Sequence, residues 1–225
     1  EEQASLRFNW NAGFAKDPFN SDGVYYGSQF VHKSLDKGAN WEIISPDLTT
    51  NNPNYQKGDY GGLTLDISGA ENYTSILTIA PSHLNQEVIW IGTDDGQLQI
   101  TRNGGKNWKN LTSQIKGLPK ESWIARIHAS RYEEGTAWVV ANNYRKGDYR
   151  PFLFKTSDFG KSWKSVVDET DVKGYTLSFI QDPVNEKLLF LGTENGLWVS
   201  INEGESWTKI KNGFPSVSTM DLVIQ

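Results

Sequence analysis

SLDKGANW, at residues 34–41, is a pattern that the chain repeats three more times, and these repeats determine its architecture. The other copies are TRNGGKNW (101–108), TSDFGKSW (156–163) and SINEGESW (200–207). Each octet has Ser or Thr first, Asp or Asn third, Gly fifth and Trp eighth. Four matches at four fixed positions are more than chance provides, and internal repeats of this kind indicate a fold built from repeated units.

The residue types of the octet are those of a tight turn that leads into a strand. The hydroxyl and the carboxylate or amide can bond to nearby backbone N–H groups. The glycine supplies a positive φ that other residues resist, and the tryptophan begins the next strand with a large ring to bury. We therefore predict a structural role for the repeated positions, which are Ser34, Asp36, Gly38, Trp41, Thr101, Asn103, Gly105, Trp108, Thr156, Asp158, Gly160, Trp163, Ser200, Asn202, Gly204 and Trp207.

Apolar runs and turn signals precede the octets. Asp95-Gly96 and Asn195-Gly196 are two-residue hairpin signals between alternating runs. With the strand that follows the octet, each repeat contains four strands in about 40–50 residues, which is the size of a propeller blade. No segment has helical periodicity. The sequence therefore predicts an all-β fold, a β-propeller of four-stranded antiparallel blades.

The whole chain is predicted to form a single propeller segment of about four blades plus one strand. The blades span about 5–50, 73–116, 122–170 and 174–213, and the extra strand spans 217–225. Propellers have about 4–8 blades, and ring closure protects strand edges. We expect a piece of a six- to eight-bladed ring, with a compact four-bladed ring as the alternative. The end blades would then expose apolar faces to the remaining blades of the parent chain or to self-association.

Composition and charge exclude several classes of function. The absence of cysteine removes disulfides, thiolate catalysis and Cys-ligated zinc. The chain has 22 Lys and Arg against 27 Asp and Glu and no basic block, which argues against a nucleic-acid partner. No apolar run is long enough to span a membrane. The three histidines lie in different units without ligand spacing, so we expect no metal and no cofactor.

The octets resemble the Asp-box, or BNR, repeats of sialidase-type and sortilin-type β-propellers. The resemblance continues through RFNWNAGFAKDPFNSDGVYYGSQFVHKSLDKGANWEIISPDLT (7–49) and VIWIGTDDGQLQITRNGGKNWKNLT (88–112). These stretches are similar to large secreted bacterial proteins of the BNR-repeat glycosyl hydrolase type. The resemblance covers nearly the whole chain and implies a propeller fold. It also implies a secreted, periplasmic or cell-surface location, but it does not settle activity.

Two segments are longer than the repeat requires, 51–72 between the first two units and 142–151 inside the third. Long loops on a rigid scaffold are where binding concentrates, so we expect a contact region for a glycan or for a protein or peptide ligand here. Aromatic rings near these loops could stack on sugars or pack against a peptide. The candidate ligand-binding residues are Tyr60, Trp123, Tyr144, Arg145, Tyr149 and Arg150.

Catalysis is the alternative function. Sialidases use a tyrosine nucleophile and carry an early Arg-Ile-Pro motif, which this chain lacks. Other glycosidases need two carboxylates about 5–5.5 Å or about 6.5–9.5 Å apart, for which the loop candidates are Asp59, Asp66 and Asp148. We expect a module that binds glycan or protein through loops on one face, without catalysis of its own. The alternatives are part of a glycoside hydrolase cleft that needs further blades and sortilin-like binding of a peptide in the propeller tunnel.

Overall fold

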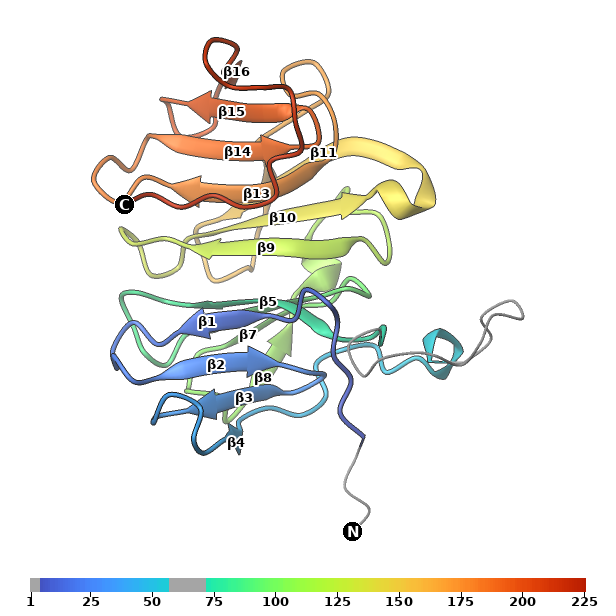
Figure 1. Ribbon diagram of the computed structural model, residues 1–225, viewed down its shortest axis with the longest axis vertical. Coiled ribbons are helices and arrows are strands. Elements are labelled where there is room, and N and C mark those ends of the chain that lie inside the picture. Colours follow the sequence, from blue (N-terminus) through green and yellow to red (C-terminus); the bar gives the residue numbers. More distant parts are fainter. Residues whose placement is uncertain (1–4, 57–71) are drawn as a thin grey trace.

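The computed structural model describes residues 5–56 and 72–225, and within them sixteen strands form four antiparallel sheets (Figure 1). Each sheet uses four strands that are consecutive in sequence, and we call the sheets blades 1 to 4. Blade 1 contains β1 (Phe14–Lys16), β2 (Val24–Gly27), β3 (Val31–Ser34) and β4 (Glu42–Ile43). Blade 2 contains β5 (Ile76–Pro81), β6 (Ile89–Thr93), β7 (Leu98–Thr101) and β8 (Trp108–Asn110).

The second half of the chain repeats this order, and the all-β propeller prediction is confirmed. Blade 3 contains β9 (Trp123–Ala129), β10 (Ala137–Asn143), β11 (Asp148–Thr156) and β12 (Lys164–Ser165). Blade 4 contains β13 (Thr176–Gln181), β14 (Leu189–Thr193), β15 (Gly196–Ser200) and β16 (Thr208–Lys209). The helical elements of the described residues are the short 3₁₀ turns η1 (Pro53–Tyr55), η2 (Thr112–Gln114) and η3 (Tyr144–Lys146).

The four octets form the same turn between the third and fourth strands. In the first octet, the Ser34 hydroxyl donates to the Asp36 carboxylate and accepts the N–H of Gly38, both at 2.8 Å. Asp36 also accepts the N–H of Asn40 at 2.8 Å. The same three hydrogen bonds recur in the other octets at 2.8–3.0 Å, with Asn in place of Asp in two of them. Each octet glycine has a φ between 79° and 99°, a backbone region that favours glycine.

The acidic octets give the fold a pH dependence. Hydrogen bonds from Ser162 lower the pKa of Asp158 from 3.8 to about 2. A carboxyl group with a lowered folded pKa stabilises the fold above its unfolded pKa and loses that contribution as the pH falls through the folded value. We therefore expect the stability advantage of the wild type over Asp158→Asn to be complete at pH 7 and to disappear between about pH 4 and pH 2. Urea unfolding of both proteins at a series of pH values measures this difference in the free energy of unfolding.

The second octet provides the reverse control for this prediction. Asn103 accepts the N–H of Asn107 at 2.9 Å, as Asp158 accepts that of Ser162 at 2.9 Å. Asn103→Asp should therefore gain the pH dependence that Asp158→Asn loses. Parallel pH profiles for all three proteins would show that the octet carboxylates do not stabilise the turn.

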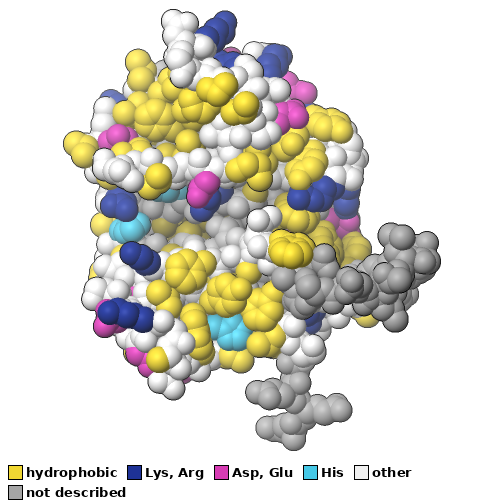
Figure 2. Space-filling view, in the orientation of Figure 1, with side chains coloured by type: hydrophobic (Ala, Val, Ile, Leu, Met, Phe, Trp, Pro, Cys, Tyr) yellow, Lys and Arg dark blue, Asp and Glu magenta, His cyan; other side chains and the backbone are white. Residues whose placement is uncertain are grey.

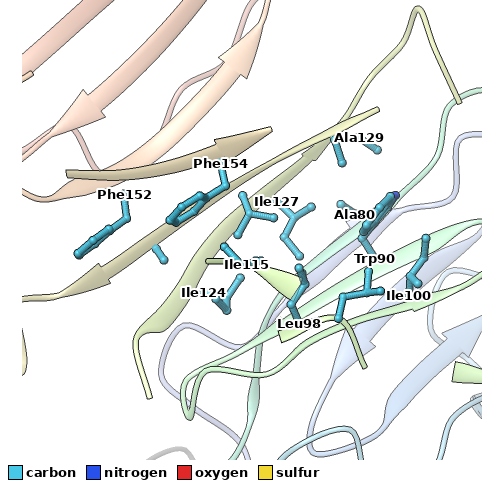
Figure 3. Packing of buried hydrophobic residues seen from close by; sticks show 14 of the residues in the cluster. Ala80, Trp90, Leu98, Ile100, Ile115, Ile124, Ile127, Ala129, Phe152 and Phe154 are labelled. Atoms are coloured by element: carbon cyan, nitrogen blue, oxygen red, sulfur yellow. The ribbon is translucent and has the colours of Figure 1, made fainter. Parts of the chain in front are cut away.

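The hydrophobic core lies between the blades rather than inside any one of them. Tyr25 of blade 1 and Ile91 of blade 2 belong to one buried cluster. Figure 3 shows the next cluster, in which Trp90 of blade 2 packs with Ile127 and Phe154 of blade 3. A third cluster joins blades 3 and 4 in the same way. Each blade therefore needs a neighbour on each side to bury both of its faces.

Glycines in the second strands allow the blades to approach closely. A Cβ on Gly27 would lie 2.8 Å from Ile76 of blade 2, and one on Gly92 would lie 2.3 Å from Ile124 of blade 3. Neither distance leaves room for a methyl group beside the next inner strand. These glycines set how near consecutive blades can pack.

The predicted extra strand at 217–225 is not a regular strand in the structure. Thr219 nevertheless lies beside blade 4 at the position where the first residue of the next blade's inner strand would lie. Its N–H donates to the carbonyl of Thr193 at 3.0 Å, as the N–H of Ile76 donates to the carbonyl of Ser28 at 2.8 Å. A regular strand requires a ladder of such bonds to a neighbouring strand, and the segment makes no such ladder.

The four blades are arranged around a hollow that opens to one side of the molecule (Figure 2). The first strand of every blade lines it, since Phe14, Thr78, Arg126 and Leu177 all border this space. Strands β1, β5, β9 and β13 are therefore the inner strands of the propeller. Within the described ranges, no helix has the length and apolar character that crossing a membrane requires.

Candidate functional site

The hollow between the inner strands has a volume of about 430 Å³ and a mixed polar and apolar lining. Asn11 and Asn142 contribute amide groups, while Trp123 contributes an aromatic ring. Arg126 of β9 forms an ion pair with Asp221, which follows Thr219 in the C-terminal segment. Concave sites with a few polar groups among apolar ones are typical binding sites for small ligands.

An aromatic cluster lies at one end of the hollow, formed by Trp123, Tyr144, Arg145, Tyr149 and Tyr175. The guanidinium carbon of Arg145 is 3.2 Å from the ring centroid of Trp123 and 4.4 Å from that of Tyr144. Tyr144 stacks on Tyr175 with centroids 4.3 Å apart, and Tyr149 lies 6.1 Å from Tyr175. The guanidinium packs on both rings, and such contacts orient its N–H donors.

The long segment of blade 3 positions this cluster. Strand β10 ends at Asn143, the η3 turn follows, and Gly147 reverses the chain with a φ of 78° before β11 begins. The turn places Tyr144 and Arg145 beside the first residue of β9, Trp123, although more than twenty residues separate them in sequence. The structure therefore brings together four of the six predicted ligand-binding residues.

The described start of the other long segment, residues 51–56, contacts the same part of the molecule. Tyr55 of η1 lies edge-on to Tyr73 with ring centroids 5.3 Å apart. The hydroxyl of Tyr55 and the ammonium of Lys146 both donate to the carboxylate of Glu121. Because the hydrogen bond from Lys146 favours the ionised form, the pKa of Glu121 is lowered. Glu121 thus joins η1 and η3, which lie on the same side of the blades in Figure 1.

Three of the predicted site residues lie outside the described residues: Tyr60, Asp59 and Asp66. The remaining catalytic candidate, Asp148, is bound by Arg150, whose Nε and Nη2 donate to its two oxygens at 2.9 and 2.7 Å. These hydrogen bonds lower the pKa of Asp148. An ionised, paired carboxylate does not suit a general acid, which needs a raised pKa. Arg150 is likewise engaged locally and not with the aromatic cluster.

Buried carboxylates beside this end of the hollow belong to the β6–β7 turn. Asp94 accepts the N–H of Ser75 at 2.8 Å and the side-chain amide of Asn9 at 3.0 Å. Asp95 accepts the N–H and the hydroxyl of Thr50 at 2.7 and 2.6 Å. Burial raises the pKa of Asp94 to about 7. Their oxygens fasten the segments around residues 9 and 50 to blade 2, which is a structural role.

The described residues contain no group of three or more His, Asp or Glu side chains that could hold a metal ion. Among the histidines, His128 packs against Trp138 and Phe179 at centroid distances of 6.0 and 5.7 Å. Burial lowers the pKa of His128 to about 3, so the ring is neutral at physiological pH. His32 lies on blade 1 against Trp41.

Tyr73, Glu121 and Tyr175 are site residues that were not predicted from the sequence. For Tyr175 a signal was present, because it immediately precedes the inner strand of blade 4 and Trp123 begins that of blade 3. Aligned units therefore place two aromatic residues at the same corner of adjacent blades. Glu121 gave no such signal, since its role depends on contacts with segments distant in sequence.

No family model matches the sequence. Among curated proteins, the chain is similar to sortilin from Rattus norvegicus, with 27% identity over 165 residues that cover 72% of this chain and 19% of sortilin. It is also similar to the oligoxyloglucan-reducing end-specific xyloglucanase of Emericella nidulans, with 29% identity over 126 residues that cover 56% of this chain and 15% of the enzyme. The chain spans less than a fifth of the length of these relatives.

Solved structures give the same result for the fold. An ancestral GH74 enzyme superimposes with a TM-score of 0.64 at 19% identity, covering 94% of this chain and 26% of the enzyme. The GH74 xyloglucanase from Xanthomonas campestris gives 0.62 at 16% identity, covering 88% and 29%. YCF48 bound to D1 peptide gives 0.50 at 14% identity, covering 95% and 62%.

The fold and these similarities define the class of protein: the chain has the four-stranded antiparallel blades of a β-propeller. Within this class it is similar to sortilin and, in fold, to the GH74 xyloglucanases.

Proposed function

We propose that this propeller segment binds glycan, with the aromatic cluster as its contact region. The observation that carries the proposal is the cluster itself, in which Arg145 packs on Trp123 and Tyr144 beside the hollow and Tyr175 joins Tyr144 to Tyr149. Sugar rings offer apolar C–H faces that stack on aromatic rings, and hydroxyl groups that bond to guanidinium and amide groups. The similarity to xyloglucanases supports glycan as the ligand class.

The members of the cluster are suited to different contacts. Tyr149 is 57% exposed and presents a free ring face for stacking. The face of Trp123 is covered by Arg145, whose exposed donors are held in place for hydroxyl groups. Asn142, which is buried, accepts from Nη1 of Arg145 at 3.4 Å and so helps to hold the guanidinium in place. The site therefore combines a stacking surface with oriented polar groups.

The binding test is a titration with xyloglucan oligosaccharides, followed by calorimetry. Tyr149→Ala should weaken binding about tenfold, which corresponds to about 1.4 kcal/mol for a lost stacking contact. Because Tyr149 is exposed, the variant should fold like the wild type. Phe19→Ala is the matched control, since Phe19 is 48% exposed in the β1–β2 turn at the opposite end of blade 1. Equal affinity for both variants, or no binding by the wild type, would contradict the proposal.

We further propose that the segment belongs to a ring of six to eight blades in a protein located outside the cytoplasm, and that it lacks catalysis of its own. One solved structure of this fold is the extracellular domain of a putative hybrid two-component system from B. thetaiotaomicron, with a TM-score of 0.54 at 15% identity. The pairing of Asp148 with Arg150 supports a non-catalytic segment. Release of reducing ends from xyloglucan by the isolated chain would contradict it.

Two alternatives remain distinguishable by experiment. The similarity to xyloglucanases favours a contribution to a glycoside hydrolase cleft that requires further blades. In that case a longer protein would release reducing ends, and Asp148→Asn would abolish this activity if Asp148 is catalytic. The similarity to sortilin and to peptide-bound YCF48 favours a peptide in the hollow. Peptide binding that survives Tyr149→Ala would support this second alternative.

A further inference from the structure

A second pocket, of about 240 Å³, lies where the inner strands of blades 1, 2 and 3 finish. It shares Ile79 and Ile127 with the hollow, so the two spaces adjoin. Pro81 and Ala129, the last residues of β5 and β9, also line it. Because Trp123 is the first residue of β9, this pocket and the aromatic cluster lie toward opposite ends of that strand. We call it the basal pocket.

The basal pocket combines buried apolar residues with exposed basic ones. Ile79, Ala80 and Ile127 line it and are 6%, 7% and 4% exposed. Lys16, at the end of β1, and His83, in the β5–β6 turn, line it as well, and both are exposed. Figure 2 shows histidine and basic side chains close together at the left of the view, where β1 and β9 end in Figure 1. Blades 1 and 2 therefore each bring a basic group to this pocket.

Arg131, in the β9–β10 turn, adds a basic group from blade 3. Burial, followed by the charge of Arg131, lowers the pKa of His83, and the same charge contributes to the lowered pKa of His128. Arg131 therefore lies close to both histidines. Each of the other five arginines of the chain has an ion pair or a ring contact. Within the described part of the chain, the side chains of Arg131, Lys16 and His83 have no ion pair, hydrogen bond or ring contact.

The carboxylates of the neighbouring turns are engaged elsewhere. Asp17 is buried and forms an ion pair with Lys33 at 3.5 Å. Glu133 and Glu134 accept hydrogen bonds from their own turn and from the β5–β6 turn, both at 2.9 Å. The charges that shift the pKa values of the two histidines are all basic. No carboxylate of the described residues therefore neutralises the positive charge at the basal pocket.

We propose that the basal pocket binds a sulfate or phosphate group, with Lys16, His83 and Arg131 donating to its oxygens. Three donors from three blades suit an anion that has several oxygens and two negative charges, and charge-assisted hydrogen bonds of this kind are strong. A carboxylate has one charge and two oxygens and would satisfy fewer of them. The apolar walls strengthen the attraction, because a low-dielectric concave surface focuses the field of the basic groups.

The inference does not rest on the glycan proposal, since no residue of the aromatic cluster lines the basal pocket. The group is either a free ion or an ester on a larger molecule such as a sugar. The two sources share the same oxygens and the same donors. They differ in whether the buried apolar residues, Ile79 and Ile127, gain a contact with the rest of the molecule.

Sulfate is the probe that makes the role of His83 measurable, because its charge stays constant where histidine titrates. The lowered pKa of His83 leaves its ring mostly neutral at pH 7. A bound dianion favours the protonated ring, so the affinity for sulfate should rise as the pH falls through the pKa of His83. We expect a dissociation constant about threefold lower at about pH 5.5 than at about pH 7.5, and a pH-independent one in His83→Gln.

NMR titration of the 225-residue chain with sodium sulfate, against sodium chloride at equal ionic strength, tests the site. The ring signals of His83 should shift, whereas those of His32, which is hydrogen-bonded to Ser28 in blade 1, should not. Lys16→Ala and Arg131→Ala should each weaken sulfate binding about fivefold. Lys106→Ala is the matched control, because Lys106 is an exposed lysine of the second octet that does not line the pocket.

Glucose 6-sulfate, titrated in the same way, identifies the source of the group. Tighter binding than that of the free ion indicates an ester on a sugar, and equal or weaker binding indicates a site for the ion.

Three results would overturn the proposal. These are the absence of any sulfate-dependent shift of His83, unchanged affinity in both Lys16→Ala and Arg131→Ala, and an equal loss in Lys106→Ala. The substituted side chains are exposed, so the variants should fold, and circular dichroism checks this. Binding of xyloglucan oligosaccharide by Lys16→Ala and by the wild type tests the glycan proposal separately.

Discussion

Replacing Gly92 with alanine is expected to destabilise the protein by about 3 kcal/mol, at the upper end of the usual cost of overpacking a core. The added Cβ would lie 2.3 Å from Cγ2 of Ile124 and 2.8 Å from Cγ2 of Thr78. Ile124 is fully buried and belongs to the cluster between blades 2 and 3. Neither neighbour can move away without shifting an inner strand. The added methyl group would therefore disturb the packing of blade 2 against blade 3.

The control for this prediction is Gly104→Ala in the second octet. Gly104 has a φ of 67°, and a Cβ there would meet no atom within 4 Å. Alanine at this position carries only the local cost of a left-handed backbone, about 1–2 kcal/mol. Urea unfolding of both variants separates the two effects. A Gly92→Ala variant no less stable than Gly104→Ala would show that blade spacing does not depend on the bare backbone at Gly92.

The sequence was sufficient for the blades because the octet turn depends on local contacts. The bonds from Ser34 to Asp36 and from Gly38 to Ser34 join residues two and four positions apart. Such bonds can be inferred from residue types and spacing alone. The strand order within each blade also follows, since each strand pairs with its neighbour in sequence. A fold with this many local pairings is unusually accessible to prediction from one sequence.

The site was less accessible because its contacts are not local. The sequence placed Trp123 and Arg145 in one list of candidates, but the position of the guanidinium on the indole ring depends on how β9, β10 and η3 pack. Glu121 binds Tyr55 and Lys146, which lie on either side of it at long sequence distance. No periodicity or motif marks such a residue.

The ion pair of Asp148, a catalytic candidate from the sequence, also follows from local strand geometry. Asp148 and Arg150 are two positions apart at the start of β11, and their side chains form an ion pair on the surface. The alternation of a strand puts such residues on the same face. That rule was available from the sequence, and it favours an ion pair over a free acid.

Replacing Trp207 with alanine is expected to cost about 3–5 kcal/mol, the range for removing a buried tryptophan. Trp207 is 8% exposed and packs in the cluster between blades 3 and 4. Its indole also donates to the carbonyl of Val166 at 2.8 Å. The substitution therefore leaves both a cavity and an unpaired buried carbonyl, and each is destabilising.

Two further substitutions divide this cost and connect it to the arrangement of blades. Trp207→Phe keeps much of the ring and loses the hydrogen bond, so it should cost about 1 kcal/mol from that bond, plus a smaller packing loss. Trp41→Ala, measured by urea unfolding, should cost less than Trp207→Ala, because Trp41 is 45% exposed and contacts no preceding blade among the described residues. The two tryptophans have the same octet and the same turn, so the difference between the alanine variants measures what a neighbouring blade adds. Equal losses at both positions would mean that the tryptophan stabilises its own turn and not the packing of one blade on the next.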